Sequence, residues 1–271
     1  MSMKYRALTI ERSGAVARVR MLPVRTSFNL SPPAELHQEM GHAMSTLRNE
    51  DDIHLVILTG AEDGEFVVPP PTAQFRAGGH SGRLENAHAE WARGIGVIRA
   101  HQAMAEMEKP IIAQVNGDAM GFGSSLMFNC DLIIAREDAK ICDMHLGLGT
   151  VVPSGGTEPV GAHFSMYPGD GGLSVVPLFM SPARAKEYLF LAREYSAREM
   201  ADLGWINRAV PMTELAAVTG EFADRLLERA PDVIAYTKRV ANRNVVQQLN
   251  VTLDAAAAYE HLSIRDWLAR R

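Results

Sequence analysis

The chain has 271 residues, of which 47% are hydrophobic and 22% are charged, a composition typical of a globular protein with a sizeable core. Its net charge is −5, and it has no basic run or basic–aromatic stripe. These features argue against a nucleic-acid-binding protein. No uncharged apolar run reaches membrane-spanning length, and Cys130 and Cys142 both lie in apolar surroundings. Because no signal peptide is recognisable, we expect a soluble, cytoplasmic protein with reduced and buried thiols.

The first 60 residues predict two strands, a helix and a third strand. Residues 5–21 alternate between apolar and polar side chains around Ser13 and Gly14, which is the pattern of a β-hairpin. Apolar residues then recur at helical spacing over about 34–48, and HLVILTG at 54–60 is apolar enough for a buried strand. This order of elements indicates an α/β protein.

The next segments lead to a glycine-rich turn. Residues 61–83 include three consecutive prolines, which neither continue a helix nor donate to a sheet, so we expect an irregular surface segment. A long helix is predicted over about 86–108. An apolar strand at 111–115 then runs into the turn at 121–123, with an apolar helix behind it. Such a turn points backbone N–H groups outward at a helix N-terminus, where they can stabilise a developing negative charge.

A strand at 131–135 is followed by a long irregular segment. Residues 146–169 are rich in glycine and proline, and they are too many for an ordinary connection. Two similar fragments lie within them, VVPSGGTEPV and MYPGDGGLSV, the second of which extends a little further. We therefore predict a local insertion at about 150–165.

The rest of the chain is predicted to be mainly helical. Two helices and a short strand are expected between Ser181 and Val210, and the last segment is helical except at Ala230 and Pro231. No low-complexity linker divides the chain. We therefore expect one core over residues 1–210 and a helical C-terminal region over residues 211–271.

Three segments in this order resemble the crotonase family, the enoyl-CoA hydratase/isomerase superfamily. They are KPIIAQVNGDAMGFGSSL, CDLIIA and RAKEYLFLAREYSAREMADLGWINRAVP. The resemblance covers essentially the whole chain. It implies an α/β fold, a crotonase-like ββα superhelix with a helical C-terminal trimerisation region, and assembly as a homotrimer or a dimer of trimers.

Most members of this family bind a coenzyme A thioester and polarise its carbonyl with two backbone N–H groups, which stabilise an enolate. The resemblance implies one donor at Phe122, between the turn residues Gly121 and Gly123, and the other at Gly79 in FRAGGH. A competing alignment of GEFVVPP would place Pro70 at the second donor position, and proline has no N–H. Coenzyme A would be part of the substrate, and no separate cofactor is implied.

Two departures from the family pattern decide the expected chemistry. Where the hydratases carry two glutamates as acid and base, this chain has Ser125 and His145. An imidazole can take a proton from water near neutral pH when a carboxylate orients it, and Asp170 in PGDGG is the natural orienter. Glu158 could take that place, but the spacing to RAKEY favours Asp170. We expect Ser125 and Asp143 to line the substrate site together with the turn glycines.

A branch of the family that hydrolyses C–C bonds of β-diketones, of the 6-oxocamphor hydrolase type, is similar at several of these positions. The similarity implies catalytic roles for His145 and Asp170, for His37 in HQEM, and for Glu260 in EHL. A further histidine of that branch is replaced by Phe122 here, so the oxyanion hole would have to hold the substrate carbonyl instead.

The leading hypothesis is an enzyme that cleaves a C–C bond of a β-dicarbonyl compound hydrolytically, with a His–Asp pair activating water. The second is hydratase, isomerase or lyase chemistry on an acyl-CoA thioester, with His145 as the only base. The third is a catalytically silent, oligomeric binding protein, which the serine at position 125 motivates. No cluster shows metal-ligand spacing, so no metal site is predicted. The expected partner is a small carbonyl or acyl-CoA substrate, and neither nucleic acid nor a membrane.

Overall fold

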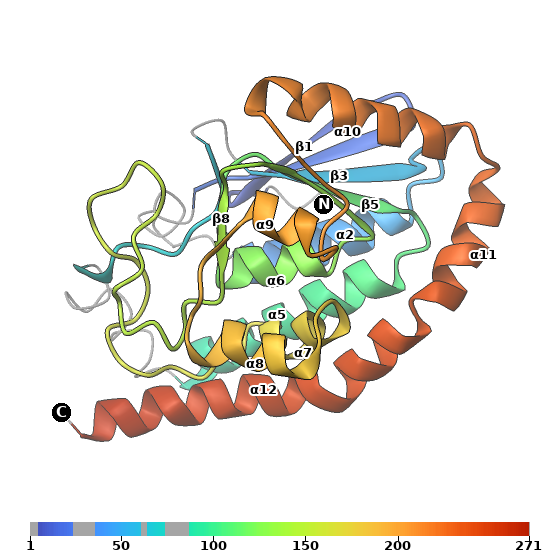
Figure 1. Ribbon diagram of the computed structural model, residues 1–271. Helices are drawn as coiled ribbons and strands as arrows, with labels where there is room; N and C mark the ends of the chain where they lie inside the picture. The colour runs from blue at the N-terminus through green and yellow to red at the C-terminus, as the bar shows by residue number, and fades with distance from the viewer. Residues whose placement is uncertain (1–4, 24–35, 61–63, 74–86, 271) are drawn as a thin grey trace.

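The computed structural model describes residues 5–23, 36–60, 64–73 and 87–270 (Figure 1). Gly79, the expected second oxyanion donor, lies outside these ranges. Within the described part of the chain, no helix is both long enough and apolar enough to cross a membrane.

A six-stranded sheet forms the centre of the fold. Its first two strands make an antiparallel hairpin around Gly14, whose φ of +56° suits a glycine, and the remaining strands pair in parallel. A parallel strand covered on both faces is mostly apolar, as the buried run LVILT in the third strand is. The strands, in their order across the sheet, are β1 (Leu8–Ser13), β2 (Val16–Met21), β3 (Leu55–Thr59), β5 (Ile111–Val115), β7 (Leu132–Arg136) and β10 (Arg208–Val210).

A second, smaller sheet lies beside the first and leads to the glycine turn. It consists, in order, of β4 (Glu65–Val67), β6 (Asp118–Met120), β8 (Lys140–Cys142) and β9 (Tyr195–Ser196). The expectation that the whole of 61–83 is irregular is wrong at β4. Strands of two or three residues are too short to show a periodicity, and only their pairing across the chain defines them.

Helices cover both faces of the main sheet (Figure 1). α10 lies across one face, while α2, α5 and α6 lie on the other, and α12 runs past α5 and α7. The helices are α2 (Leu36–Arg48), α5 (Ala87–Glu106), α6 (Phe122–Phe128), α7 (Gly172–Val175), α8 (Pro182–Phe190), α9 (Ala197–Asp202), α10 (Met212–Leu227), α11 (Pro231–Ala241) and α12 (Arg243–Ala269), with a 3₁₀ turn η1 (Val176–Leu178). The predicted helical C-terminal region is confirmed, with a further break at Asn242.

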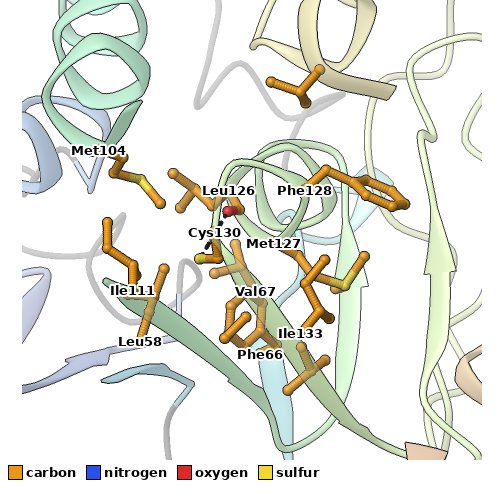
Figure 2. Packing of buried hydrophobic residues seen from close by; sticks show 14 of the residues in the cluster. Leu58, Phe66, Val67, Met104, Ile111, Leu126, Met127, Phe128, Cys130 and Ile133 are labelled. Atoms are coloured by element: carbon orange, nitrogen blue, oxygen red, sulfur yellow. Dashed lines mark hydrogen bonds between the residues drawn. The ribbon is translucent and has the colours of Figure 1, made fainter. Parts of the chain in front are cut away.

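The main hydrophobic core joins α6 to the strands beneath it and to α5. Figure 2 shows Phe66 and Val67 of β4 close to α6, and Met104 of α5 on its other side. Cys130 is in this core, and its Sγ donates to the carbonyl of Leu126 at 3.3 Å. Both cysteines are free and buried, and burial raises the pKa of each thiol, so the expectation of buried thiols is confirmed.

The segment predicted as an insertion folds against two distant parts of the chain. Gly161 donates its N–H to the carbonyl of Pro70 at 3.1 Å, which ties the segment to the chain that follows β4. Phe164 stacks on Trp267 of α12, with 4.1 Å between the ring centroids. The N–H of Met166 donates to the carbonyl of His145 at 3.2 Å. The chain directly after the insertion therefore supports the backbone of a predicted catalytic residue.

Candidate active site

The site is built around the N-terminus of α6. Gly121 precedes the helix with a φ of +56°, and no side chain caps the helix. A Cβ at Gly123 would lie 2.6 Å from the carbonyl oxygen of Val67, so that glycine allows α6 to pack closely on β4. The first N–H groups of a helix lack intrahelical acceptors, and Phe122 is the first residue of α6. The sequence feature expected to provide an oxyanion donor is therefore present as a turn leading into a helix.

His145 is fixed by a carboxylate two residues before it. Its Nδ1 lies 2.6 Å from Oδ1 of Asp143, which also accepts the backbone N–H of His145 at 3.2 Å. Asp143 is fully buried, and His145 is 3% exposed. The double contact fixes both the direction of the ring and the nitrogen that carries its proton. Asp143 thus orients the imidazole, whereas from the sequence we expected it to line the substrate site.

Asp170 meets the side chains at both positions where the family hydratases carry glutamate. Its Oδ2 lies 3.3 Å from Nε2 of His145, and its Oδ1 accepts the hydroxyl of Ser125 at 3.1 Å. The predicted pair of His145 and Asp170 is therefore brought together by the fold. Ser125 is fully buried, and its hydroxyl also lies 3.2 Å from the carbonyl oxygen of Gly121.

Charge and burial shift the proton affinities of this pair. Burial by itself would lower the pKa of His145, but the negative charges of Asp170 and Asp143 outweigh it and raise that pKa to about 10. Burial is also the main cause that raises the pKa of Asp170 to about 6, and the charge of His145 opposes the rise. Between these values the pair consists of an imidazolium and a carboxylate, and it titrates as a unit.

The other two predicted catalytic residues also lie in this region. The ring of His37, on α2, is 4.2 Å from that of Phe122, centroid to centroid. Glu260, on α12, is 4% exposed, and a Cβ at Gly169 would lie 2.6 Å from its Oε2. Both charges act on the pKa of Asp170. The fold therefore gathers these side chains from separate helices around one carboxylate.

The second oxyanion donor has two candidate segments in the sequence. The chain at 66–70 lies beside the glycine turn, since the carbonyl of Val67 packs against Gly123. The competing alignment, however, places Pro70 at the donor position, and proline has no N–H to donate. Gly79 lies outside the described residues, so its assignment stays a prediction.

A group with metal-ligand potential is present in the described part of the chain, although the sequence did not predict one. Ligand atoms of Asp143, His145 and Asp170 lie within 4.8 Å of one another. The two ring nitrogens face different carboxylates, however, at 2.6 and 3.3 Å. An imidazole cannot turn both nitrogens to one ion, and one imidazolium already lies between the two acids. The arrangement fits a hydrogen-bonded chain better than a metal centre.

Comparison with known proteins agrees with this fold. The family model described as enoyl-CoA hydratase/isomerase matches residues 11–163 and 160–264. The short-chain-enoyl-CoA hydratase of Clostridium acetobutylicum is 26% identical over 260 residues, which are 95% of this chain and 88% of that protein. The crotonyl-CoA hydratase of Syntrophomonas wolfei is 28% identical over 221 residues, covering 81% of this chain and 75% of that protein.

Two solved structures show the same fold. An enoyl-CoA hydratase/isomerase from Mycobacterium paratuberculosis superimposes with a TM-score of 0.79 at 22% identity, over 95% of this chain and 93% of that one. A beta-diketone hydrolase from the cyanobacterium Anabaena, bound to (S)-3-oxocyclohexyl acetic acid, gives 0.78 at 21% identity, over 97% and 96%.

The α/β fold, with a buried histidine–aspartate pair near a glycine turn, is that of a protein of the crotonase type. The family match spans most of the chain, so the protein belongs to the enoyl-CoA hydratase/isomerase family and is an enzyme of that superfamily. The family match therefore argues against the hypothesis of a catalytically silent binding protein.

Proposed function

We propose that this enzyme forms an enolate from a small carbonyl substrate, and that Asp170, beside a charged His145, carries out the proton transfer. The observation that carries the proposal is the convergence of Ser125 and His145 on Asp170. Family hydratases have glutamates at those two positions. Here the side chains at both positions contact the carboxylate of Asp170, so a single carboxylate replaces the usual pair of glutamates.

The roles within the pair differ from the sequence-based hypothesis. An imidazole whose pKa is raised to about 10 is already protonated at neutral pH and cannot act as the base. Asp170, whose pKa is raised to about 6, is a carboxylate at neutral pH and holds a proton readily enough to be an acceptor. We therefore assign Asp170 as the base and His145 as the cation beside it.

The site chemistry favours hydrolytic cleavage of a β-dicarbonyl compound. Asp170 would take a proton from water while the resulting hydroxide attacks one carbonyl carbon. The C–C bond then breaks, and its electron pair leaves as an enolate that the N–H of Phe122 would stabilise. The proton held by Asp170 returns to the enolate carbon, which yields a carboxylic acid and a ketone. This reading is supported by the histidine–aspartate pair and by the nearby His37 and Glu260.

The relatives favour a second candidate, and they favour it more strongly than the first. The named curated relatives act on enoyl-CoA or crotonyl-CoA, as their names state, and their similarity extends over most of the chain. In this candidate an acyl-CoA thioester binds with its carbonyl at the Phe122 N–H. Asp170 would then be the acid–base group of a hydratase, isomerase or lyase reaction, and coenzyme A would enter as part of the substrate.

Assays with two probes separate these candidates. The purified enzyme is given a 2-substituted cyclic 1,3-diketone in H₂¹⁸O, and separately crotonyl-CoA. Cleavage of the diketone with ¹⁸O in the new carboxylate supports hydrolysis, whereas hydration of crotonyl-CoA supports the second candidate. Asp170→Asn should abolish either activity, while Asp254→Asn, on the exposed side of α12, is the matched control and should not. Full activity of Asp170→Asn would contradict both candidates.

We also propose that the chain assembles as a homotrimer or a dimer of trimers through its region 211–271. The C-terminal helices expose large apolar side chains, among them Tyr236, Val240, Val251, Tyr259 and Leu262. Exposed apolar surface of this kind is typical of contacts between subunits. Light scattering coupled to gel filtration tests the proposal, and a monomer at micromolar concentration would contradict it.

A further inference from the structure

The loop that carries Asp170 is unusually closely packed at its glycines. A Cβ at Gly169 would lie 2.6 Å from Oε2 of Glu260, and one at Gly172 would lie 2.5 Å from Oδ2 of Asp143. At Gly171 the closest atom belongs to His101 of α5, whose Nε2 would be 2.2 Å away. Each of these three glycines thus leaves space for a titratable side chain from another part of the chain.

His101 is the member of this set to which the reaction gives no role. It is fully buried, and its Nδ1 lies 3.0 Å from the carbonyl of Val97, one turn earlier in α5. That contact directs the other nitrogen, Nε2, toward Gly171, and a backbone hydrogen bond with Ser125 of α6 also acts on the ring.

The contact between His101 and Gly171 fixes the backbone next to the catalytic carboxylate. Gly171 has a φ of +105° and precedes α7, whose residues Ser174 and Val175 donate to its carbonyl at 2.9 and 3.1 Å. The edge of the ring fills the space that a side chain would need at this position, since three of its atoms lie within 2.8 Å of the Cβ site. A shift of the ring would let Gly171, and with it Asp170, move.

His101 also packs on the other half of the site. Its ring lies 5.9 Å from that of Phe122, the residue at the start of α6, and its carbonyl accepts the side-chain amide of Asn129 at 2.9 Å. Burial, assisted by the nearby His37, lowers the pKa of His101 to about 4, so the ring is neutral at physiological pH. It can therefore fill space and exclude water without adding a charge beside Asp170.

We propose that His101 is a positioning residue, which holds the carboxylate of Asp170 in place by packing against Gly171. The proposal rests on the role given above to Asp170 as the proton acceptor. Other groups face this carboxylate from every side. They are His145 and Asp143 after β8, the Ser125 hydroxyl on α6, Glu260 on α12 and His37 on α2. His101 is distinct from them because it acts on the backbone of the loop.

The test uses the folded enzyme without substrate, so that it does not depend on knowing the reaction. Long-range ¹H–¹⁵N spectra of protein labelled at its histidines report the chemical shifts of the His145 ring nitrogens as a function of pH. In the wild type, these signals should show a step near pH 6, where the neighbouring Asp170 loses its proton. In His101→Ala, water should reach the loop and relieve the burial that raises this pKa. The step should then move down by about one pH unit or more.

Two further variants make the result specific. His101→Leu fills most of the same space with a neutral side chain and should leave the step nearly in place. His54→Ala, which removes an exposed histidine, is the control and should show no change. A folded His101→Ala protein with an unchanged step would overturn the proposal. If that variant does not fold, His101→Asn makes the same test, because its shorter side chain also withdraws from Gly171.

The experiment distinguishes failure of the positioning role from failure of the proposed function. A wild-type protein without any step near pH 6 would remove Asp170 as the acceptor, and the inference about His101 with it. If the wild type shows the step and His101→Ala leaves its pH unchanged, only the role of His101 would be ruled out. Turnover provides a second readout once a substrate is known. Loss of positioning should then lower kcat more than it raises KM.

Discussion

Nδ1 of His145 lies 2.6 Å from Oδ1 of Asp143, and both side chains are almost completely shielded from solvent. The contact assigns a proton to Nδ1 and turns Nε2 toward the rest of the site. Because a buried carboxylate stabilises the imidazolium, it also helps to keep His145 charged.

Replacing Asp143 should therefore change both the orientation and the charge of the ring. Asp143→Asn removes a negative charge at nearly constant volume, so the pKa of His145 should fall from its raised value of about 10. Because misplacing a catalytic group by about 1 Å can cost about 100-fold, kcat/KM should fall by roughly that factor. The pH dependence of kcat/KM measures both effects, since its alkaline limb should move to lower pH. Asp254→Asn, exposed on α12, is the control, and an alkaline limb that stays in place would contradict the assignment.

Removing the Ser125 hydroxyl should make Asp170 harder to ionise. The hydroxyl donates to the carboxylate at 3.1 Å, and a hydrogen bond to the charged form lowers a carboxyl pKa. In Ser125→Ala the acidic limb of the pH–rate profile should rise by about 1 to 2 pH units, as expected for a hydrogen bond to a charged group.

The neighbouring serine provides a matched control for that substitution. Ser124 is also fully buried, and its hydroxyl donates to the carbonyl of Gly121 at 3.0 Å, which the Ser125 hydroxyl also contacts, at 3.2 Å. Ser124→Ala should leave the acidic limb where it is. Equal shifts in the two variants would mean that loss of packing, and not of the bond to Asp170, is responsible.

The charge of His145 should also appear in the stability of the protein. Its folded-state pKa, about 10, lies above the ordinary value of 6.5, so the folded state binds the proton more tightly than the unfolded state. The resulting stabilisation is fully present below about pH 6.5 and is lost as the pH rises toward 10. Differential scanning calorimetry should therefore show a Tm that falls over this range, and less steeply in His145→Gln. Parallel Tm curves for the two proteins would exclude a strongly stabilised imidazolium.

Adding a methyl group beside Glu260 should disturb the site from the side of α12. A Cβ at Gly169 would lie 2.4 Å from the Cβ of Glu260, a contact that requires the backbone to shift. We expect Gly169→Ala to lower the free energy of unfolding by about 1 to 3 kcal/mol, measured by urea denaturation. Gly220 has nothing within 4 Å of its Cβ position on α10, so Gly220→Ala should instead stabilise the protein, by up to about 1 kcal/mol. A stable Gly169→Ala protein would mean that α12 is less tightly held than the structure indicates.

Several parts of the fold could be predicted because their signals are local. The hairpin at β1 and β2 follows from its alternation, and the strand LVILT and the helix at 182–190 follow from apolar runs and an initial proline. The strands β4, β6, β8 and β9 could not be predicted in this way. They consist of two or three residues each, and the hydrogen bonds that define them join segments far apart in the sequence.

By itself, the sequence determined which residues are available for chemistry. It showed a serine and a histidine in place of two glutamates, and an aspartate between two pairs of flanking residues in PGDGG. Only the tertiary structure decided what those residues do. It placed Ser125 and His145 on the same carboxylate, gave the histidine a second acid in Asp143, and buried all of them. Proton affinity depends on burial and on neighbouring charges, which are properties of the folded chain. The sequence alone therefore could not decide whether His145 or Asp170 accepts the proton.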